Sequence, residues 1–124
     1  MVFKKRMDDP GLMQDIAVKG IIEKKGQEIV CLDLRNVKTA VADYFIICHA
    51  DSGTQVRAIA GSVEEEIYKV FHEDPWHKEG LENSEWVILD YASVVVHIFK
   101  GEKRYFYGIE ELWGDAEVVY QSAS

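Results

Sequence analysis

Residues 44–71, YFIICHADSGTQVRAIAGSVEEEIYKVF, decide the fold of this 124-residue chain. The stretch opens with an uninterrupted apolar run and then changes to apolar residues that recur every three or four positions. Between the two lies Ser52-Gly53-Thr54-Gln55, which has the Ser-x-x-Gln spacing of a helix capping box. The sequence therefore predicts a buried strand followed directly by an amphipathic helix that reaches Phe71.

Upstream of this stretch, the sequence predicts one helix and one more strand. Asp9-Pro10 has the form of a cap and first-turn proline, the apolar residues that follow step at three and four positions, and Gly26 is placed to end the helix. Residues 29–32 form a second continuous apolar run. Because neither strand alternates between apolar and polar residues, we expect helices or loops to cover both faces of the sheet.

Downstream, residues 73–85 contain Pro75, Gly80 and Asn83 and are expected to form a loop. Residues 86–91 and 94–99 then read as two strands joined by the short Ala92-Ser93 connection of a hairpin. Because side chains alternate along a strand, the hairpin has one almost purely apolar face and one mixed face. The apolar face carries Val87, Leu89, Tyr91, Val94, Val96 and Ile98, and the mixed face carries Trp86, Ile88, Asp90, Val95, His97 and Phe99.

A last amphipathic segment runs from Tyr105 to Trp113 and ends at Gly114. The predicted order is helix, strand, strand, helix, strand, strand, helix, which indicates an α/β layered domain with a mixed sheet of about four strands flanked by helices. The chain has no internal repeat or linker, so we expect one domain over residues 9–118, with residues 1–8 and 119–124 as flexible ends.

Charge and hydropathy exclude several classes of protein. With 22 acidic against 14 basic residues, the formal net charge is −8, which argues against a basic surface for nucleic acid and favours a basic protein partner. No apolar run approaches the roughly 20 residues that a bilayer requires, and no signal-peptide pattern opens the chain. We therefore expect a cytoplasmic protein with no membrane contact and little or no sequence-specific nucleic-acid binding, in which Cys31 and Cys48 are buried thiols.

The sequence lacks the motifs of the common enzyme classes. There is no glycine-rich phosphate loop, nucleophile elbow or zinc-protease helix, and His72 and His77 are spaced poorly for a metal site. Gly61-Ser62 lies in mid-helix without the acidic pair that two-metal nucleotide transfer requires. We expect no catalysis, no cofactor and no metal.

Asp90 and His97 share the mixed face of the predicted hairpin, on a diagonal. They can form a satisfied polar pair inside the sheet, a polar element of a protein-binding face or, least favoured because no nucleophile or pocket is evident, a catalytic pair. Large aromatic residues crowd this last third of the chain beside acidic ones. Core packing explains most of them, but the combination is also typical of a binding hot spot for a basic partner.

Five blocks resemble the ribosomal silencing factor, or Iojap, family in order and spacing: ADYFIIC at 42–48, TQVxAIA at 54–60, WVILDY at 86–91, VVVHIF at 94–99 and LWGDA at 112–116. The resemblance covers residues 10–118 and implies a nucleotidyltransferase-like fold without the catalytic acidic pair. It also implies binding to the large ribosomal subunit through its fourteenth ribosomal protein, which blocks joining with the small subunit and represses translation. An alternative is a homodimeric large-subunit assembly factor that does not inhibit joining directly.

The resemblance also suggests which residues bind the partner. We expect the hairpin positions to contact it or to organise the contact, and two residues of the last segment to support them; the full set is Trp86, Asp90, Tyr91, His97, Phe99, Leu112 and Trp113. Asp90 is the expected acceptor for a basic side chain. Where the family often has Gly-Asp between the hairpin strands, this chain has Ala92-Ser93.

Overall fold

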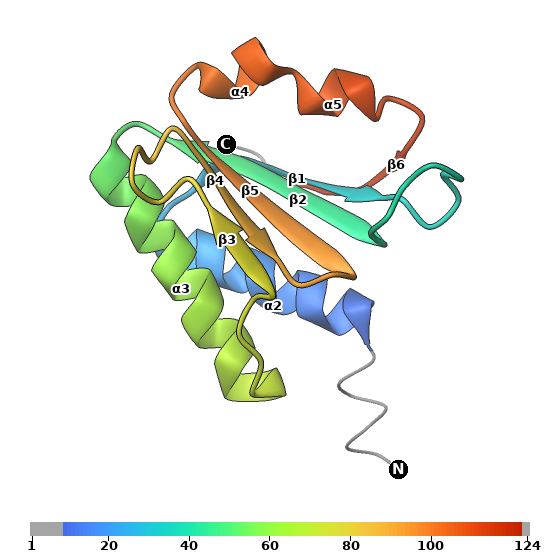
Figure 1. The fold of residues 1–124 in the computed structure, drawn as a ribbon, viewed down its shortest axis with the longest axis horizontal. Coiled ribbons are helices and arrows are strands. Elements are labelled where there is room, and N and C mark those ends of the chain that lie inside the picture. Colours follow the sequence, from blue (N-terminus) through green and yellow to red (C-terminus); the bar gives the residue numbers. More distant parts are fainter. Residues whose placement is uncertain (1–8, 123–124) are drawn as a thin grey trace.

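The computed structural model describes residues 9–122 as a mixed sheet with helices on both faces (Figure 1). The sheet has six strands in the order β3-β4-β5-β2-β1-β6, two more than the sequence predicts. The elements in chain order are α2 (Pro10–Glu23), β1 (Gln27–Asp33), β2 (Tyr44–Ala50), α3 (Gly53–Phe71), β3 (His77–Glu79), β4 (Trp86–Asp90), β5 (Val94–Lys100), α4 (Lys103–Tyr107), α5 (Ile109–Leu112) and β6 (Glu117–Gln121). The expectation of an α/β fold with a mixed sheet is confirmed.

The parallel pairing in this sheet, between β2 and β5, lies at its centre. The chain leaves β2, crosses one face as α3, forms the β3–β4 edge and returns as β5, and the other pairs of neighbouring strands are antiparallel. The two central strands are buried along nearly their whole length. This burial explains why their sequences are continuous apolar runs rather than alternating ones.

The two long helices begin with the caps that the sequence predicts. Asp9 Oδ1 accepts a hydrogen bond from the backbone N–H of Leu12, and Ser52 Oγ accepts one from that of Gln55, at 3.0 and 3.1 Å. The Gln55 side chain does not complete a capping box on its own helix but donates to the carbonyls of Lys24 and Lys25, at 3.2 and 3.4 Å. It thereby ties the start of α3 to the end of α2.

α2 and α3 lie side by side on one face of the sheet and enclose the larger core with it. Their backbones approach closely at Gly20, whose carbonyl accepts a hydrogen bond from Ser62 Oγ at 2.8 Å. A Cβ atom at Gly20 would lie 2.9 Å from the Cα of Val63. Only glycine permits this contact between the helices.

The opposite face carries a smaller core and only a short cover. α4 and α5 lie over it (Figure 1), and Ile109 of α5 is buried against Val30, Ile47 and Phe99 of the sheet. The sequence predicts one amphipathic segment here. The structure instead breaks it at Gly108, which has a φ of 59°, a conformation that favours glycine.

The two additional strands correct two of our expectations. β3 lies inside the expected loop 73–85, and β6 continues to Gln121, so Tyr120 and Gln121 pair with β1 rather than belong to a flexible end. β3 consists of His77, Lys78 and Glu79 and has no apolar residue, and the apolar run of β6, Val118-Val119-Tyr120, is too short to show a strand pattern. Residues 1–8 and 123–124 lie outside the described residues.

The β4–β5 hairpin has the predicted faces, but the expected contact between Asp90 and His97 is not formed. Asp90 pairs with Val95 in the register, and its Oδ1 accepts the backbone N–H of Ala92, which has a φ of 73° in the turn. His97 Nδ1 instead accepts the indole N–H of Trp86 at 3.1 Å. His97 is 5% exposed, and burial lowers its pKa to about 4, so its ring is neutral at pH 7.

Replacing Gly20 by alanine should destabilise the protein by about 1 to 3 kcal/mol, because the added methyl group forces α2 away from the backbone of α3. Gly61 provides the control, since it lies in α3 at a position where a methyl group would meet no neighbouring element within 4 Å. Gly61→Ala should stabilise the helix by about 0.5 to 1 kcal/mol. Urea unfolding of both variants measures the difference, and equal midpoints would refute the close approach at Gly20.

Burial of neutral His97 should make the protein lose stability in acid. Because its pKa is lower in the folded than in the unfolded state, the unfolded chain binds more protons between pH 6.5 and 4. Neutral His97 therefore makes its full contribution to the free energy of unfolding above about pH 6.5. This contribution is lost as the pH falls toward 4, by up to about 3 kcal/mol. Between pH 7 and pH 4, the free energy of unfolding should fall by about 3 kcal/mol less in His97→Gln than in the wild type. Equal losses in the two proteins would contradict a buried, neutral His97.

Candidate protein-docking surface

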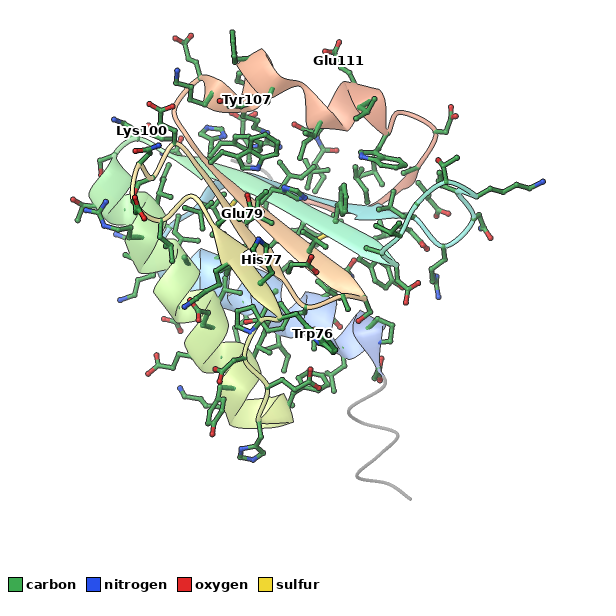
Figure 2. All side chains as sticks on the ribbon, in the orientation of Figure 1. Trp76, His77, Glu79, Lys100, Tyr107 and Glu111 are labelled. Atoms are coloured by element: carbon green, nitrogen blue, oxygen red, sulfur yellow. The ribbon has the colours of Figure 1, made fainter. Side chains whose placement is uncertain are left out.

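The cover formed by α4 and α5 leaves the β3–β4 side of its sheet face open. The strand register puts His77 beside Asp90 and Glu79 beside Ile88, so these four side chains lie on one face. Figure 2 labels His77 and Glu79 on β3 and Tyr107 in α4. We call this region the open sheet face and define it by its half-buried and exposed residues: Phe45, His77, Glu79, Trp86, Ile88 and Asp90.

Trp86 links the open sheet face to the short helices. Its ring stacks on Phe99 with centroids 5.1 Å apart and packs against Tyr107 of α4 at 4.6 Å. On the neighbouring strand, Phe45 meets His97 edge-on at 4.7 Å and contacts Trp113 at 5.8 Å. The aromatic rings are thus held in place by one another rather than free to rotate.

The predicted binding residues do not all reach the surface. Trp86, Asp90 and Trp113 are half-buried, and Leu112 is 76% exposed on α5. His97 and Phe99 lie on the same face but are buried beneath these residues, so they support the surface rather than form it. Tyr91 is separate from the others. It is 3% exposed in the core under α2 and α3, where burial raises the pKa of its hydroxyl.

The open sheet face combines apolar rings with acidic groups. Asp90 uses Oδ1 to hold the hairpin turn, which leaves Oδ2 free to accept from a partner. Glu79 Oε2 lies 2.6 Å from His77 Nε2, and this contact is exposed to solvent. Sequence reasoning missed His77 and Glu79, because a strand of three residues is too short to show alternation.

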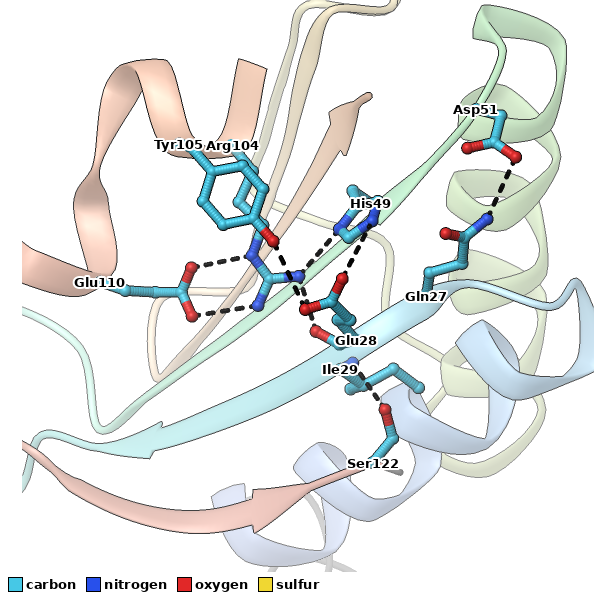
Figure 3. A network of polar contacts seen from close by, with 9 residues as sticks. All are labelled: Gln27, Glu28, Ile29, His49, Asp51, Arg104, Tyr105, Glu110 and Ser122. Carbon is cyan, nitrogen blue, oxygen red and sulfur yellow. Dashed lines mark hydrogen bonds and ion pairs between the residues drawn. The ribbon is translucent and has the colours of Figure 1, made fainter. Parts of the chain in front are cut away.

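Arg104 fixes the α4–α5 cover from below, in the network that Figure 3 shows. The guanidinium is 3% exposed and donates through Nε and Nη2 to both carboxylate oxygens of Glu110, at 2.8 and 3.0 Å. Its Nη1 donates to the carbonyl of Glu28 at 2.6 Å and lies 3.0 Å from His49 Nδ1. One side chain therefore joins α4, α5, β1 and β2.

The network also determines the state of His49. A guanidinium can only donate, so His49 Nδ1 accepts and the ring is neutral. Burial, and then the charge of Arg104, lower the pKa of His49. Glu28 lies at the bulge of β1 with a φ of 47°, and its conformation is held by the bond from Arg104 to its carbonyl.

Within residues 9–122 no three His, Cys, Asp or Glu side chains come together as metal ligands. None of the helices described has both the length and the hydropathy to span a membrane. The open sheet face carries two carboxylates, Glu79 and Asp90, and the rings of Phe45 and Trp86.

Comparison with known proteins gives a consistent assignment. Residues 8–124 match the family model described as ribosomal silencing factor during starvation. The chain is 39% identical over 116 residues to a ribosomal silencing factor of Halalkalibacterium halodurans, in a match that covers 91% of this chain and 94% of the relative. It is 38% identical over 104 residues to that of Bacillus subtilis, with 84% and 86% covered.

A solved structure extends the agreement to three dimensions. A crystal structure of a protein from Chromobacterium violaceum superposes with a TM-score of 0.80 at 30% identity, and the match covers 94% of this chain and 97% of that one. The family model, the relatives and the structure each span most of the chain. The chain therefore belongs to the ribosomal silencing factor family.

Proposed function

We propose that the open sheet face docks on the fourteenth ribosomal protein of the large subunit, where the bound chain blocks joining with the small subunit and represses translation. Family membership supports the ribosome as target. The observation that supports the docking mode is that Glu79, Asp90 and Trp86 lie along one sheet face that α4 and α5 leave open. Leu112 and Trp113 form the α5 border of the same surface.

The charge of the chain suits a basic protein surrounded by RNA. A net charge of −8 repels phosphate at long range, so contact with rRNA alone is unfavourable. A basic side chain that reaches the half-buried Asp90 finds a carboxylate whose Oδ2 is not used by the hairpin turn, on the face that also carries Phe45 and Trp86. Charge thus selects the protein surface, and the rings supply buried area.

This mechanism requires affinity and bulk but no chemical turnover. In it the chain acts in the cytoplasm, needs neither cofactor nor metal, and inhibits for as long as it stays bound. Likeness to nucleotidyltransferases remains a prediction from the resemblance. The alternative role, a dimeric assembly factor that leaves joining unaffected, predicts binding without inhibition.

Purified protein should cosediment with isolated large subunits of Bacillus subtilis and lower the fraction of joined ribosomes when small subunits are added. The order of addition matters, since a steric block must be in place before joining. Sucrose-gradient profiles measure both quantities. Binding only to joined ribosomes would refute the proposal, and binding without loss of joining would favour the assembly role.

Asp90→Asn should weaken binding to large subunits by about 1 to 2 kcal/mol, roughly tenfold, because it removes the charge that meets the basic partner. Asparagine retains an oxygen that can accept the Ala92 N–H, so the hairpin turn and the unfolding midpoint should be preserved.

The matched control is Glu65→Gln, which removes one charge from an exposed position on α3, on the other side of the sheet. It should leave the affinity for large subunits unchanged. Equal affinities for Asp90→Asn and Glu65→Gln in cosedimentation titrations would remove Asp90 from the contact.

A further inference from the structure

One hydrogen-bond donor beneath the open sheet face lacks an acceptor. His97 Nδ1 accepts the indole N–H of Trp86, and because the ring is neutral, Nε2 carries the ring proton. Among residues 9–122 no group accepts a hydrogen bond from this Nε2–H, although His97 is only 5% exposed. A buried donor without an acceptor costs free energy, and a hydrogen bond formed on binding would recover that cost.

The place of His97 in the sheet directs this donor toward the surface. Side chains stand roughly perpendicular to a sheet, and Nε2 lies at the end of the imidazole ring that is remote from the backbone. On the same face, Phe45 of β2 meets the ring edge-on at 4.7 Å, and Ile88 of β4 is the register neighbour of His97. Both neighbours are half-buried, so the donor lies beneath the outermost layer of side chains.

Two other buried polar atoms lack a partner among the residues described, and neither faces the docking surface. The hydroxyl of Tyr91 lies in the larger core, on the α2–α3 side of the sheet. Gln14 Oε1 belongs to α2 on that same side. The donor of His97 is therefore the one of the three that a partner on the open sheet face can reach.

We propose that His97 Nε2 donates a hydrogen bond to a main-chain carbonyl of the docked ribosomal protein, which enters between Phe45 and Ile88 as these side chains shift. A neutral acceptor fits because Trp86 already donates to Nδ1. A carboxylate would favour an imidazolium, whose Nδ1 could no longer accept from Trp86. This contact rests on the proposed function and specifies the chemistry that the open sheet face recognises.

Asp90 and His97 together require a donor and an acceptor on the same segment of the partner. Asp90 pairs with Val95, two residues before His97, so Asp90 and His97 are diagonal neighbours, about 7 to 8 Å apart. Asp90 Oδ2 receives a basic side chain, and His97 Nε2 binds the carbonyl. Carbonyls inside helices and sheets are already paired. The partner segment is therefore a loop or a free strand edge that carries a lysine or arginine close to an unpaired carbonyl.

Asparagine and glutamine at position 97 separate this contact from the structural role of the histidine. Both amides can accept the Trp86 N–H, but only the longer glutamine side chain places an N–H where Nε2 lies. In calorimetric titrations with the purified fourteenth ribosomal protein of Bacillus subtilis, His97→Asn should bind about tenfold more weakly than the wild type, and His97→Gln within about threefold of it. Urea unfolding of both variants measures any loss of stability that they share.

The imidazole N–H provides a second readout, which a purely structural histidine would not change. In isotope-labelled protein, the Nε2–H resonance of His97 should move downfield when the ribosomal protein is added. His49 is the internal control, because it is also buried and neutral but lies in the Arg104 network, and its ring signals should stay in place.

The outcomes separate this contact from the docking itself. A wild type that does not bind the ribosomal protein would refute the proposed function, and the contact with it. A wild type that binds while the His97 signal stays in place, with His97→Asn as tight as His97→Gln, would overturn the contact alone.

Discussion

The bidentate pair between Arg104 and Glu110 is the interaction on which the second face of the sheet depends. α4 and α5 have five and four residues, too few to be stable helices by themselves. The pair joins the two helices across Gly108, and the bonds from Arg104 to Glu28 and His49 attach them to the sheet. Removing Glu110 would leave the Arg104 guanidinium buried without its carboxylate, which is far costlier than losing an exposed ion pair.

The extent of this cover gives the molecule its asymmetry. α2 and α3 bury most of one face, whereas α4 and α5 reach only part of the other. Where the cover ends, Trp86 is held between Phe99 and Tyr107, and its indole N–H is satisfied by neutral His97. The half-buried surface is thus a consequence of a short C-terminal cover on a sheet whose strands are apolar on both sides.

The sequence predicts the elements in which local pattern and tertiary packing agree. The residue pattern of the sequence predicts α3, its Ser52 cap and the two faces of the β4–β5 hairpin, and in the structure the apolar residues of that pattern are buried. β3 and β6 escape prediction because edge strands are specified by hydrogen bonds to a neighbour, which no local pattern records.

Residue roles are harder to predict than elements. The hairpin register correctly puts Asp90 and His97 on one face, but sequence alone does not show that the Trp86 N–H binds His97 and that the turn binds Asp90. Arg104 also looks like an ordinary surface cation in the sequence. Its burial is evident only when β1, β2 and α5 meet. A docking surface built on such contacts is ordered before its partner arrives, so binding there immobilises few side chains and retains more of the contact energy as affinity.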